Sequence, residues 1–379
     1  MTSNSNKSAI LIDTQRKVGP DSHILGDGSV TLETLKGGLR DGVRLVTVDN
    51  GSLRFAILPD RGMGLWKAWH GDTEIGWQSP VAGPVHPSRV PIMEPGGLGW
   101  LDGFDELLVR CGLLSNGAPD FDEEGRLSHP LHGLIATKSA HFLEAKVDDD
   151  MIAVNGIVDE CRFHFHKLRL TSTVTTKPNS LVIDIHDQIT NLSGNDGEAQ
   201  ILYHVNFGAP INTPGAELVV PVKEIVPRNE HAAGSIGHWS TYGPAQQNAE
   251  EQVYFFQLLA DGQGWTKTLL RSADRKRGVS LKFNTGQLPC FTQWKNTPPE
   301  ADGYVTGLEP GTNYPNPRSF EGEKGRVVKL GPGETVKYDL SIEVHPDALS
   351  VAEAEKEIAA LQSASEPIIR QSPQADWCA

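Results

Sequence analysis

The sequence predicts an all-β protein in which antiparallel strands form a sandwich or a barrel. Short apolar and β-branched segments recur along most of the 379 residues, and polar turn sequences separate them. The segment 181–189, LVIDIHDQI, alternates at period two over most of its length. The 39 glycines and 25 prolines fall short of a disordered composition and suit many strands joined by tight turns.

The strand pattern becomes continuous at Val43, after a polar, Gly-rich arm at residues 1–40 in which we expect one or two short strands. Residues 79–100 form a long Pro- and Gly-rich loop, and its Trp and Met content indicates an ordered loop over a cleft. Strands are predicted at 43–48, 53–57, 65–69, 75–77, 133–137, 141–147, 151–158, 162–176, 180–191, 199–208, 217–226, 252–259, 266–271, 278–284, 290–295, 303–309, 326–330 and 335–345.

Two segments are predicted to be helical. Residues 101–113 carry Asp102 as an N-cap and Gly112 as a stop signal. Residues 350–361 contain good helix formers throughout, and Ser350 with Glu353 three residues later forms a capping box. Residues 364–379 are expected to be a tail. We find no repeat or linker, and therefore expect one central domain at 41–347, followed by a C-terminal helix and tail at 348–379.

The composition limits the function classes. A net charge of −14 argues against nucleic acid or an anionic membrane as a partner, because both favour a basic patch. No apolar segment approaches a membrane span, and the first residues lack the apolar core of a signal peptide. The four cysteines indicate neither a metal knuckle nor a disulfide framework. We therefore expect a cytoplasmic protein that handles neutral small molecules.

Glu309 is a candidate general base. It ends the apolar run of the segment 303–315, GYVTGLEPGTNYP, directly before a Pro-Gly turn. Partial burial at the end of a strand raises the proton affinity of a carboxylate, which suits a general base. The alternative is a structural Glu that accepts hydrogen bonds from the backbone of the turn.

His204 is a candidate proton carrier. In a strand, His204 and Asn206 of the segment YHVNFGAP share one face, where they can protonate and orient a polar ligand. The alternative is a core His satisfied by a neighbour. Trp77, Trp100 and Trp294 are candidates to stack on a sugar, or else core residues. The residues that we predict to bind a substrate are Arg61, Arg110, His132, Asn206, Trp294, Lys295, Asn313 and Arg318.

Neither a metal nor a cofactor is expected. His164 and His166, two residues apart in a predicted strand, would share one face, but no third ligand is evident nearby. No Gly-rich phosphate loop joins a strand to a helix, and no GxSxG motif is present.

Five motifs, taken together and in order, resemble the aldose 1-epimerase (galactose mutarotase-like) superfamily, in an uncharacterised epimerase-like branch. They are RGMGLW (61–66), LVRCGLLSNGAP (108–119), LHG (131–133), YHVNFGAP (203–210) and GLEPGTNYP (307–315). The pattern covers nearly the whole chain, from about Val43 to His345. The resemblance implies a large antiparallel β-supersandwich with few short helices, and an open cleft on one sheet that holds a sugar.

The resemblance also implies roles for single residues. His204 matches the catalytic acid and Glu309 the catalytic base, while Arg61 and His132 match residues that hold sugar hydroxyls. True mutarotases have Asn where this chain has Tyr203. The implied activity is a cofactor-independent isomerase that interconverts the anomers of a free sugar or sugar acid by His/Glu acid–base ring opening. The expected partner is a small-molecule carbohydrate, and the expected assembly is a monomer or homodimer.

Two other functions are compatible with the same fold. One is a non-catalytic carbohydrate-binding or sensing protein, because a fold does not determine a function. The other is a lyase or hydrolase, and hydrolysis with two carboxylates needs a second acid opposite Glu309. Asp105 and Glu106 are the candidates for that acid.

Overall fold

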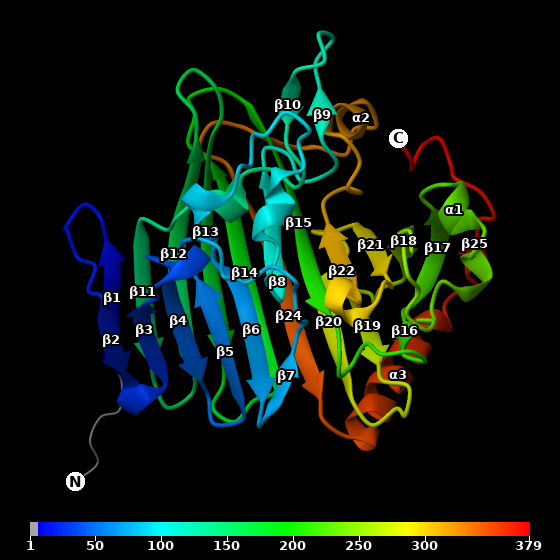
Figure 1. Cartoon of the computed structure of the whole chain (residues 1–379), viewed down its shortest axis with the longest axis horizontal. Helices are drawn as coiled ribbons and strands as arrows, with labels where there is room; N and C mark the ends of the chain where they lie inside the picture. The colour runs from blue at the N-terminus through cyan, green and yellow to red at the C-terminus, as the bar shows by residue number, and fades with distance from the viewer. Residues whose placement is uncertain (1–6) are drawn as a thin grey trace.

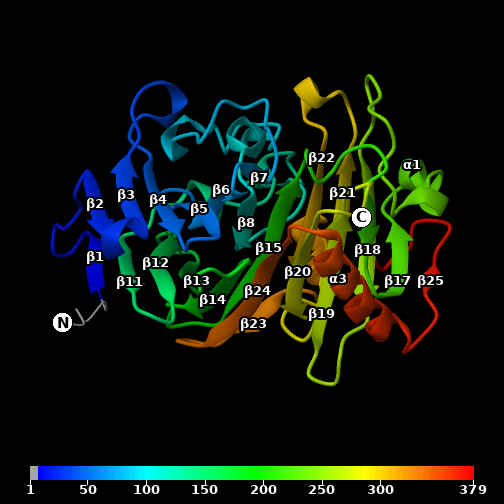
Figure 2. The same ribbon diagram turned by 90° about the horizontal axis from the view of Figure 1, so that it is seen from below.

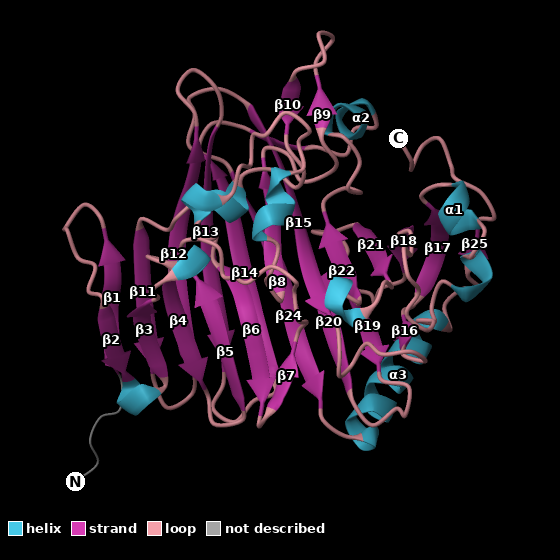
Figure 3. Ribbon diagram, viewed as in Figure 1, coloured by secondary structure: helices cyan, strands magenta, loops and turns pink. Residues whose placement is uncertain are grey.

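Two large β-sheets lie face to face and make up most of the protein (Figure 1, Figure 2). The computed structural model describes residues 7–379. Strands dominate the described residues, and the three α-helices lie at the periphery (Figure 3). All strand pairs are antiparallel except one at the edge of the larger sheet. The prediction of an antiparallel all-β sandwich with few short helices is confirmed.

The smaller sheet has nine strands. In spatial order they are β1 (Lys7–Asp13), β11 (Phe142–Val147), β12 (Ile152–Cys161), β13 (Lys167–Thr176), β14 (Val182–Asn191), β24 (Thr335–His345), β20 (Gly278–Asn284), β19 (Trp265–Arg271) and β16 (Glu217–Val219). Along β12 and β13, buried and half-buried residues alternate. One face of this sheet therefore packs into the core between the sheets, and the other faces solvent.

The larger sheet has fourteen strands. Its main path is β2 (Ser22–Leu25), β3 (Val30–Thr34), β4 (Arg44–Asp49), β5 (Leu53–Leu58), β6 (Gly64–His70), β8 (Leu108–Leu113), β15 (Gly197–Phe207), β22 (Val305–Gly311), β21 (Cys290–Asn296), β18 (Gln252–Leu258), β17 (Val222–Pro227) and β25 (Ile368–Ile369), while β7 (Thr73–Ile75) pairs with β6 and β23 (Val328–Leu330) with β15. A separate hairpin joins β9 (Asp120–Phe121) and β10 (Leu127–His129).

The central strands of the larger sheet are buried on both faces. Every residue of β8 and β22 is buried, as are the last nine residues of β15. Their inner face joins the main core, and their outer face carries a second apolar cluster that includes Trp77, Trp100 and Phe104. Loops that precede β8 therefore cover the outer face, and a site on that face is sheltered from water.

The helices are α1 (Glu230–Ala233), α2 (Arg318–Glu323) and α3 (Ala348–Gln362). The last confirms the helix predicted at 350–361, and its buried face packs against Leu269 of β19. The predicted cap is corrected by one turn: Asp347 is the N-cap and accepts a hydrogen bond from the Ser350 backbone N–H. The first six residues of the expected arm at 1–40 lie outside the described residues, and the remainder contains β1, β2 and β3.

Three local predictions were wrong. Residues 101–113 do not form an α-helix. A 3₁₀ turn at Gly99–Gly103 leads instead into strand β8, which is fully buried and whose backbone forms hydrogen bonds with β15. Residues 133–137 are not a strand, since Ile135–Thr137 is a 3₁₀ turn. The expected strand at 162–176 begins only at Lys167, so His164 and His166 lie in the turn after β12.

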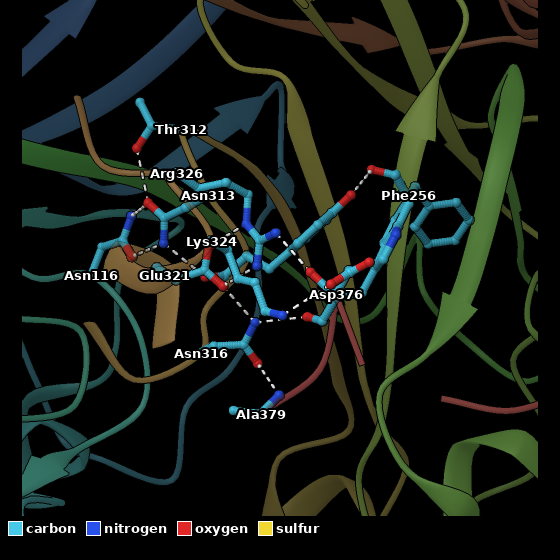
Figure 4. Close-up of polar contacts among 12 residues, drawn as sticks. Asn116, Phe256, Thr312, Asn313, Asn316, Glu321, Lys324, Arg326, Asp376 and Ala379 are labelled. Atoms are coloured by element: carbon cyan, nitrogen blue, oxygen red, sulfur yellow. Dashed lines mark hydrogen bonds and ion pairs between the residues drawn. The ribbon is translucent and has the colours of Figure 1, made fainter. Parts of the chain in front are cut away.

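The segment after α3 returns to the larger sheet instead of ending as a free tail. β25 pairs in parallel with β17. Asn316 Nδ2 donates to Trp377 O at 2.8 Å, and Ala379 N donates to Asn316 Oδ1 at 3.2 Å (Figure 4). The Trp377 ring stacks on Tyr314 with 4.9 Å between centroids. This segment therefore holds the chain that follows β22 in place. In residues 7–379, no helix has the length and apolar character to cross a membrane.

Candidate functional site

The candidate site lies on the outer face of the larger sheet, across β15, β22 and β21. The pairs Leu202↔Gly311 and Val205↔Leu308 place His204 of β15 opposite Glu309 of β22. On the other side of β22, Thr292 of β21 is the direct partner of Glu309. Residues paired across strands point to the same face. His204, Glu309 and Thr292 therefore form a row across three neighbouring strands.

This row forms part of the wall of a cavity of about 270 Å³. That is just below the range of about 300–1,000 Å³ that drug-sized ligands occupy, so the cavity suits a ligand the size of a monosaccharide. The cavity is lined by Leu98, Trp100, Leu101, Phe104, Ala118, Pro119, Leu131, His132, His204, Arg228, Glu251, Val253, Thr292, Trp294, Glu309 and Pro315. Aromatic rings surround His204: its centroid lies 5.2 Å from that of Phe104 and 5.6 Å from that of Trp294.

His204 is oriented by Asn206 on the same strand. The Asn206 amide nitrogen donates to Glu106 O at 3.0 Å and to His204 O at 3.3 Å. Its oxygen Oδ1 therefore accepts from His204 Nδ1, 2.7 Å away. The other ring nitrogen, Nε2, lies 3.2 Å from Glu309 Oε1. Asn206 thus fixes the tautomer that directs Nε2 to the carboxyl group.

The His204–Glu309 contact joins two buried titratable groups. Burial raises the pKa of Glu309 well above its usual value, with a further increase from the Glu251 carboxylate and a smaller decrease from Arg228. Burial, and then the neighbouring His132, lower the pKa of His204 well below its usual value. Both pKa shifts favour the uncharged forms, a carboxylic acid beside a neutral imidazole, which together hold one proton.

His132 faces the same cavity from the loop before Gly133. Its Nδ1 lies 3.0 Å from Asn116 O, so Nδ1 carries the proton and Nε2 is an acceptor. Burial lowers the pKa of His132 to about 4. Its ring centroid lies 4.5 Å from that of Trp100 and 5.3 Å from that of His204. His132 is thus a neutral acceptor at the cavity wall.

Two exposed charges belong to the cavity lining. Arg228 Nη1 lies 3.3 Å from Glu251 Oε1, and the Trp294 indole donates to Glu251 Oε2 at 2.7 Å. Nearly half of each charged side chain is exposed, so the pair marks the solvent side of the cavity. Within residues 7–379, two buried polar atoms of the lining lack a hydrogen-bond partner, Trp100 Nε1 and Thr292 Oγ1.

The structure brings together some of the predicted residues. His204, Glu309, His132 and Trp294 line the cavity, and Asn206 lies behind His204. The sequence reasoning missed Phe104, Arg228, Glu251 and Thr292. Thr292 had a signal, since it is two residues from Trp294 in a predicted strand and so shares its face. Arg228 and Glu251 had none, because only the pairing of distant strands brings them to Glu309.

Two arginines that were predicted to bind a ligand are buried and form ion pairs within the protein. Arg61 is ion-paired with Glu106, and its Nη2 donates to Gly103 O at 2.9 Å. Arg110 points between the sheets, where its Nε lies 2.5 Å from Asp187 Oδ2. Their predicted role in substrate binding is therefore corrected, because a buried guanidinium is held by the partners that neutralise it and satisfy its donors.

Three further predictions are corrected in the same way. The Lys295 ammonium donates to backbone carbonyls of the 238–241 segment at 2.9–3.2 Å, and burial lowers its pKa to about 8. Asn313 exchanges two side-chain hydrogen bonds with Asn116 (Figure 4). Arg318 forms an ion pair with Glu198 at 2.8 Å, away from the cavity lining. Each of these side chains is committed to a protein partner.

The predicted candidates for a second catalytic acid also lie elsewhere. Asp105 accepts a hydrogen bond from the Trp66 indole at 2.6 Å, and Glu106 pairs with Arg61. Neither lines the cavity, so neither stands opposite Glu309. Among residues 7–379 there is no group of three or more His, Cys, Asp or Glu side chains that could hold a metal ion.

Asp105→Asn is expected to stabilise the protein above neutral pH. Burial raises the pKa of Asp105 to about 7, from 3.8 for the unfolded chain. Between these two pKa values, the Asp105 carboxyl group ionises readily only in the unfolded chain. Folding stability is therefore lost as the pH rises from about 4 to 7. A pKa raised from 3.8 to about 7 corresponds to a loss of folding stability on the order of a few kcal/mol, which Asn avoids while it still accepts from Trp66. Urea unfolding at pH 5 and pH 8 tests this, and an equal effect at both pH values would contradict it.

The face-to-face sheets and the covered outer face of the larger sheet define a galactose mutarotase-like β-supersandwich. A provisionally assigned aldose 1-epimerase from Klebsiella pneumoniae subsp. pneumoniae MGH 78578 matches with a TM-score of 0.93 and 32% identity over 97% of this chain and 99% of its own. A galactose 1-epimerase from Lactobacillus acidophilus NCFM (TM-score 0.55, 13% identity, 83% of this chain, 98% of its own) shares the fold. A galactose mutarotase-like protein from Clostridium acetobutylicum also shares the fold (TM-score 0.57, 13% identity, 83% of this chain, 98% of its own).

The chain belongs to the family described as a domain of unknown function, DUF4432, whose model matches residues 40–344. No curated protein matches it in sequence. The resemblance inferred from the five motifs is confirmed by the structural neighbours, and the match to a family of unknown function agrees with an uncharacterised branch.

Proposed function

We propose that this protein is a mutarotase or a related carbohydrate epimerase that interconverts the anomers of a free sugar or sugar acid by ring opening. The observation that carries the proposal is the 3.2 Å contact between His204 Nε2 and Glu309 Oε1 in a sheltered, aromatic-walled cavity of monosaccharide size. Two adjacent proton carriers are what ring opening requires, because one atom of the substrate loses a proton while another gains one. The provisional name of the Klebsiella relative adds support.

The proposed reaction starts from the single proton that the pair holds at rest. When a sugar hydroxyl donates to Glu309, this proton moves across the short contact to His204. Glu309 then accepts the proton of the anomeric hydroxyl, and His204 gives its proton to the ring oxygen as the bond from C1 to that oxygen breaks. The open-chain aldehyde forms, and the pair again holds one proton. Rotation about C1–C2 and closure from the other face, with the roles reversed, give the other anomer.

The aromatic side chains position the sugar and exclude water from the cavity. Trp294 and Phe104 present neighbouring apolar surfaces beside the His204 ring, and such surfaces pack against the C–H face of a sugar. The His132 acceptor and the Arg228–Glu251 pair can bind hydroxyls at the walls. A low-polarity enclosure also strengthens each hydrogen bond to the reacting oxygens.

The test is proton NMR exchange between anomeric signals across a panel of aldoses and uronic acids, at a pH where spontaneous exchange is slow. We expect the protein to accelerate exchange for at least one sugar of the panel. No acceleration for any sugar, together with chemical-shift changes that show binding, would replace the enzyme by a carbohydrate-binding or sensing protein.

Gly307→Ala is expected to lower this exchange rate about 10²-fold, because small displacements of reacting groups are costly. A methyl group at position 307 would lie 2.7 Å from both Glu309 Oε1 and His204 Cε1, so the two proton carriers would have to separate. The measurement is the exchange rate with the sugar that the wild-type protein turns over best. Gly322→Ala is the control, because its added methyl would meet nothing within 4 Å. An equal, small effect of both changes would contradict the prediction.

A further inference from the structure

A second cavity, of about 640 Å³, adjoins the loop that carries His132. Leu131 and His132 line the cavity of the candidate site, whereas Pro130 and Gly133 of the same loop line the second cavity. Its other walls include β10, Lys138, and the end of β12 with the turn that follows it. No step of the proposed reaction uses this cavity, so it is a separate candidate site.

Lys138 lines the second cavity and lacks the protein partner that comparable side chains have. In residues 7–379, every other buried or half-buried lysine or arginine forms an ion pair or a hydrogen bond through its charged group. Lys138 is half-buried and forms neither within the described chain. Its charge acts on Glu160 and His166, two other lining residues, and therefore lies at the cavity. Lysine is rarely buried without a partner, so this ammonium group is suited to an anionic ligand.

Arg162, His129 and His166 line the same cavity. The Arg162 guanidinium lies 4.4 Å from the centroid of the Phe165 ring, and within residues 7–379 it forms no ion pair or hydrogen bond. Burial, and then neighbouring groups that include Arg162, His129 and Lys138, lower the pKa of His166. The cations therefore lie close enough to repel one another. An anion bound among them would replace this repulsion by attraction.

The negative charge of the cavity wall does not balance these cations. Of the described residues that line the cavity, Glu160 alone carries a carboxyl group. Glu160 is buried, and its two oxygens accept from the backbone N–H groups of Leu113 at 3.0 Å and Leu114 at 3.1 Å. Burial raises the pKa of Glu160. The cavity thus has two permanent positive charges, Lys138 and Arg162, against at most one negative charge, in a protein whose net charge is −14.

The rest of the wall is largely apolar, and includes Met93, Leu127, Pro130, Leu134 and Phe165. The volume of about 640 Å³ is much larger than an inorganic anion needs, since a water molecule takes up about 30 Å³ in the liquid. It falls within the range of about 300–1,000 Å³ that is typical of sites for organic ligands. The cavity therefore suits an anion that carries an organic part.

We propose that the second cavity binds a small organic phosphate, with the phosphate group between Lys138 and Arg162 and the carbon part against the apolar wall. A phosphate monoester carries a charge of about −1.5 to −2 at neutral pH, which matches the two permanent cations. Arginine binds phosphate through two parallel hydrogen bonds, and His129 and His166 offer further N–H donors. This inference does not depend on the proposed function.

The experiment is isothermal titration calorimetry of the full chain with phenyl phosphate, inorganic phosphate and phenol, at constant ionic strength in a buffer without phosphate. Phenyl phosphate is expected to bind with a Kd below about 1 mM, and inorganic phosphate and phenol at least about tenfold more weakly, because each lacks one half of the ligand. Lys138→Met keeps a long apolar side chain and removes the charge. We expect it to weaken phenyl phosphate at least about tenfold, the effect of losing a hydrogen bond between charged groups.

Arg162→Met is a second variant with the same expected direction, and its exposed side chain is not needed for folding. Lys223→Met is the matched control, because Lys223 of β17 is exposed and lines neither cavity. It should leave the affinity unchanged. No binding of phenyl phosphate to the wild-type protein, or the same affinity in Lys138→Met and Arg162→Met as in the wild type, would overturn the site. Equal affinity for inorganic phosphate would overturn the organic part of the assignment, and equal affinity for phenol would overturn the role of the charge.

Discussion

Glu309→Gln is expected to lower the rate of the proposed anomer exchange by about 10²–10⁴-fold, the usual contribution of a general acid–base residue. Gln has nearly the same shape, so the cavity keeps its form, but it cannot accept the proton of the anomeric hydroxyl. The fold should tolerate the change well. Burial already favours the uncharged form of Glu309, and the amide group of Gln is also uncharged and can donate to His204 Nε2. The measurement is the NMR exchange rate, with urea unfolding to compare stability.

His204→Asn is expected to lower exchange to a similar level, and the double variant should lose little more than either single variant, because the two residues share one proton. Glu198→Gln is the control, since Glu198 forms an ion pair with Arg318 away from the cavity lining. If Glu309→Gln exchanged sugars as fast as the wild-type protein, the acid–base assignment would be wrong. Loss of both activity and folding would instead show that Glu309 is a structural residue.

Asp187→Ala is expected to cost about 3–5 kcal/mol of folding stability, the usual effect of removing one partner of a buried ion pair. Asp187 of β14 accepts from Arg110 Nε at 2.5 Å and from the Tyr203 hydroxyl at 2.9 Å, and both donors come from the larger sheet. The pair thus joins the two sheets through the core. Without Asp187, the Arg110 guanidinium is left charged and buried without its partner.

The measurement is the free energy of unfolding in urea. Asp159→Ala is the matched control, because Asp159 forms an ion pair with Arg169 in which about a third of each side chain is exposed. It should cost no more than about 1 kcal/mol. Replacing Arg110 and Asp187 together by Met and Leu should recover most of the loss, since buried ion pairs can often be exchanged for apolar side chains. Equal costs for Asp187→Ala and Asp159→Ala would contradict a special role for the buried pair.

The sequence alone determined the features that depend on local pattern. The alternation at 181–189 identified β14, and the run of helix formers at 350–361 identified α3. His204 and Asn206 were placed on one face because side chains two residues apart in a strand point the same way. The five motifs identified the fold superfamily. The strand, the helix and the shared face were predicted correctly because each depends on residues close together in the chain, and the superfamily was recognised because its motifs are each local and keep their order.

Only the tertiary structure decided which side chains meet. Arg61, Arg110 and Lys295 carry the charges that a polar ligand attracts, yet each is committed to protein partners that are distant in sequence. Thr292 and Glu251 reach the cavity for the opposite reason, because β21 and β18 pair in register beside β22. A shift of one residue in that pairing would turn their side chains to the other face. Register and sheet packing are set by contacts summed over the whole chain, so no local pattern contains them.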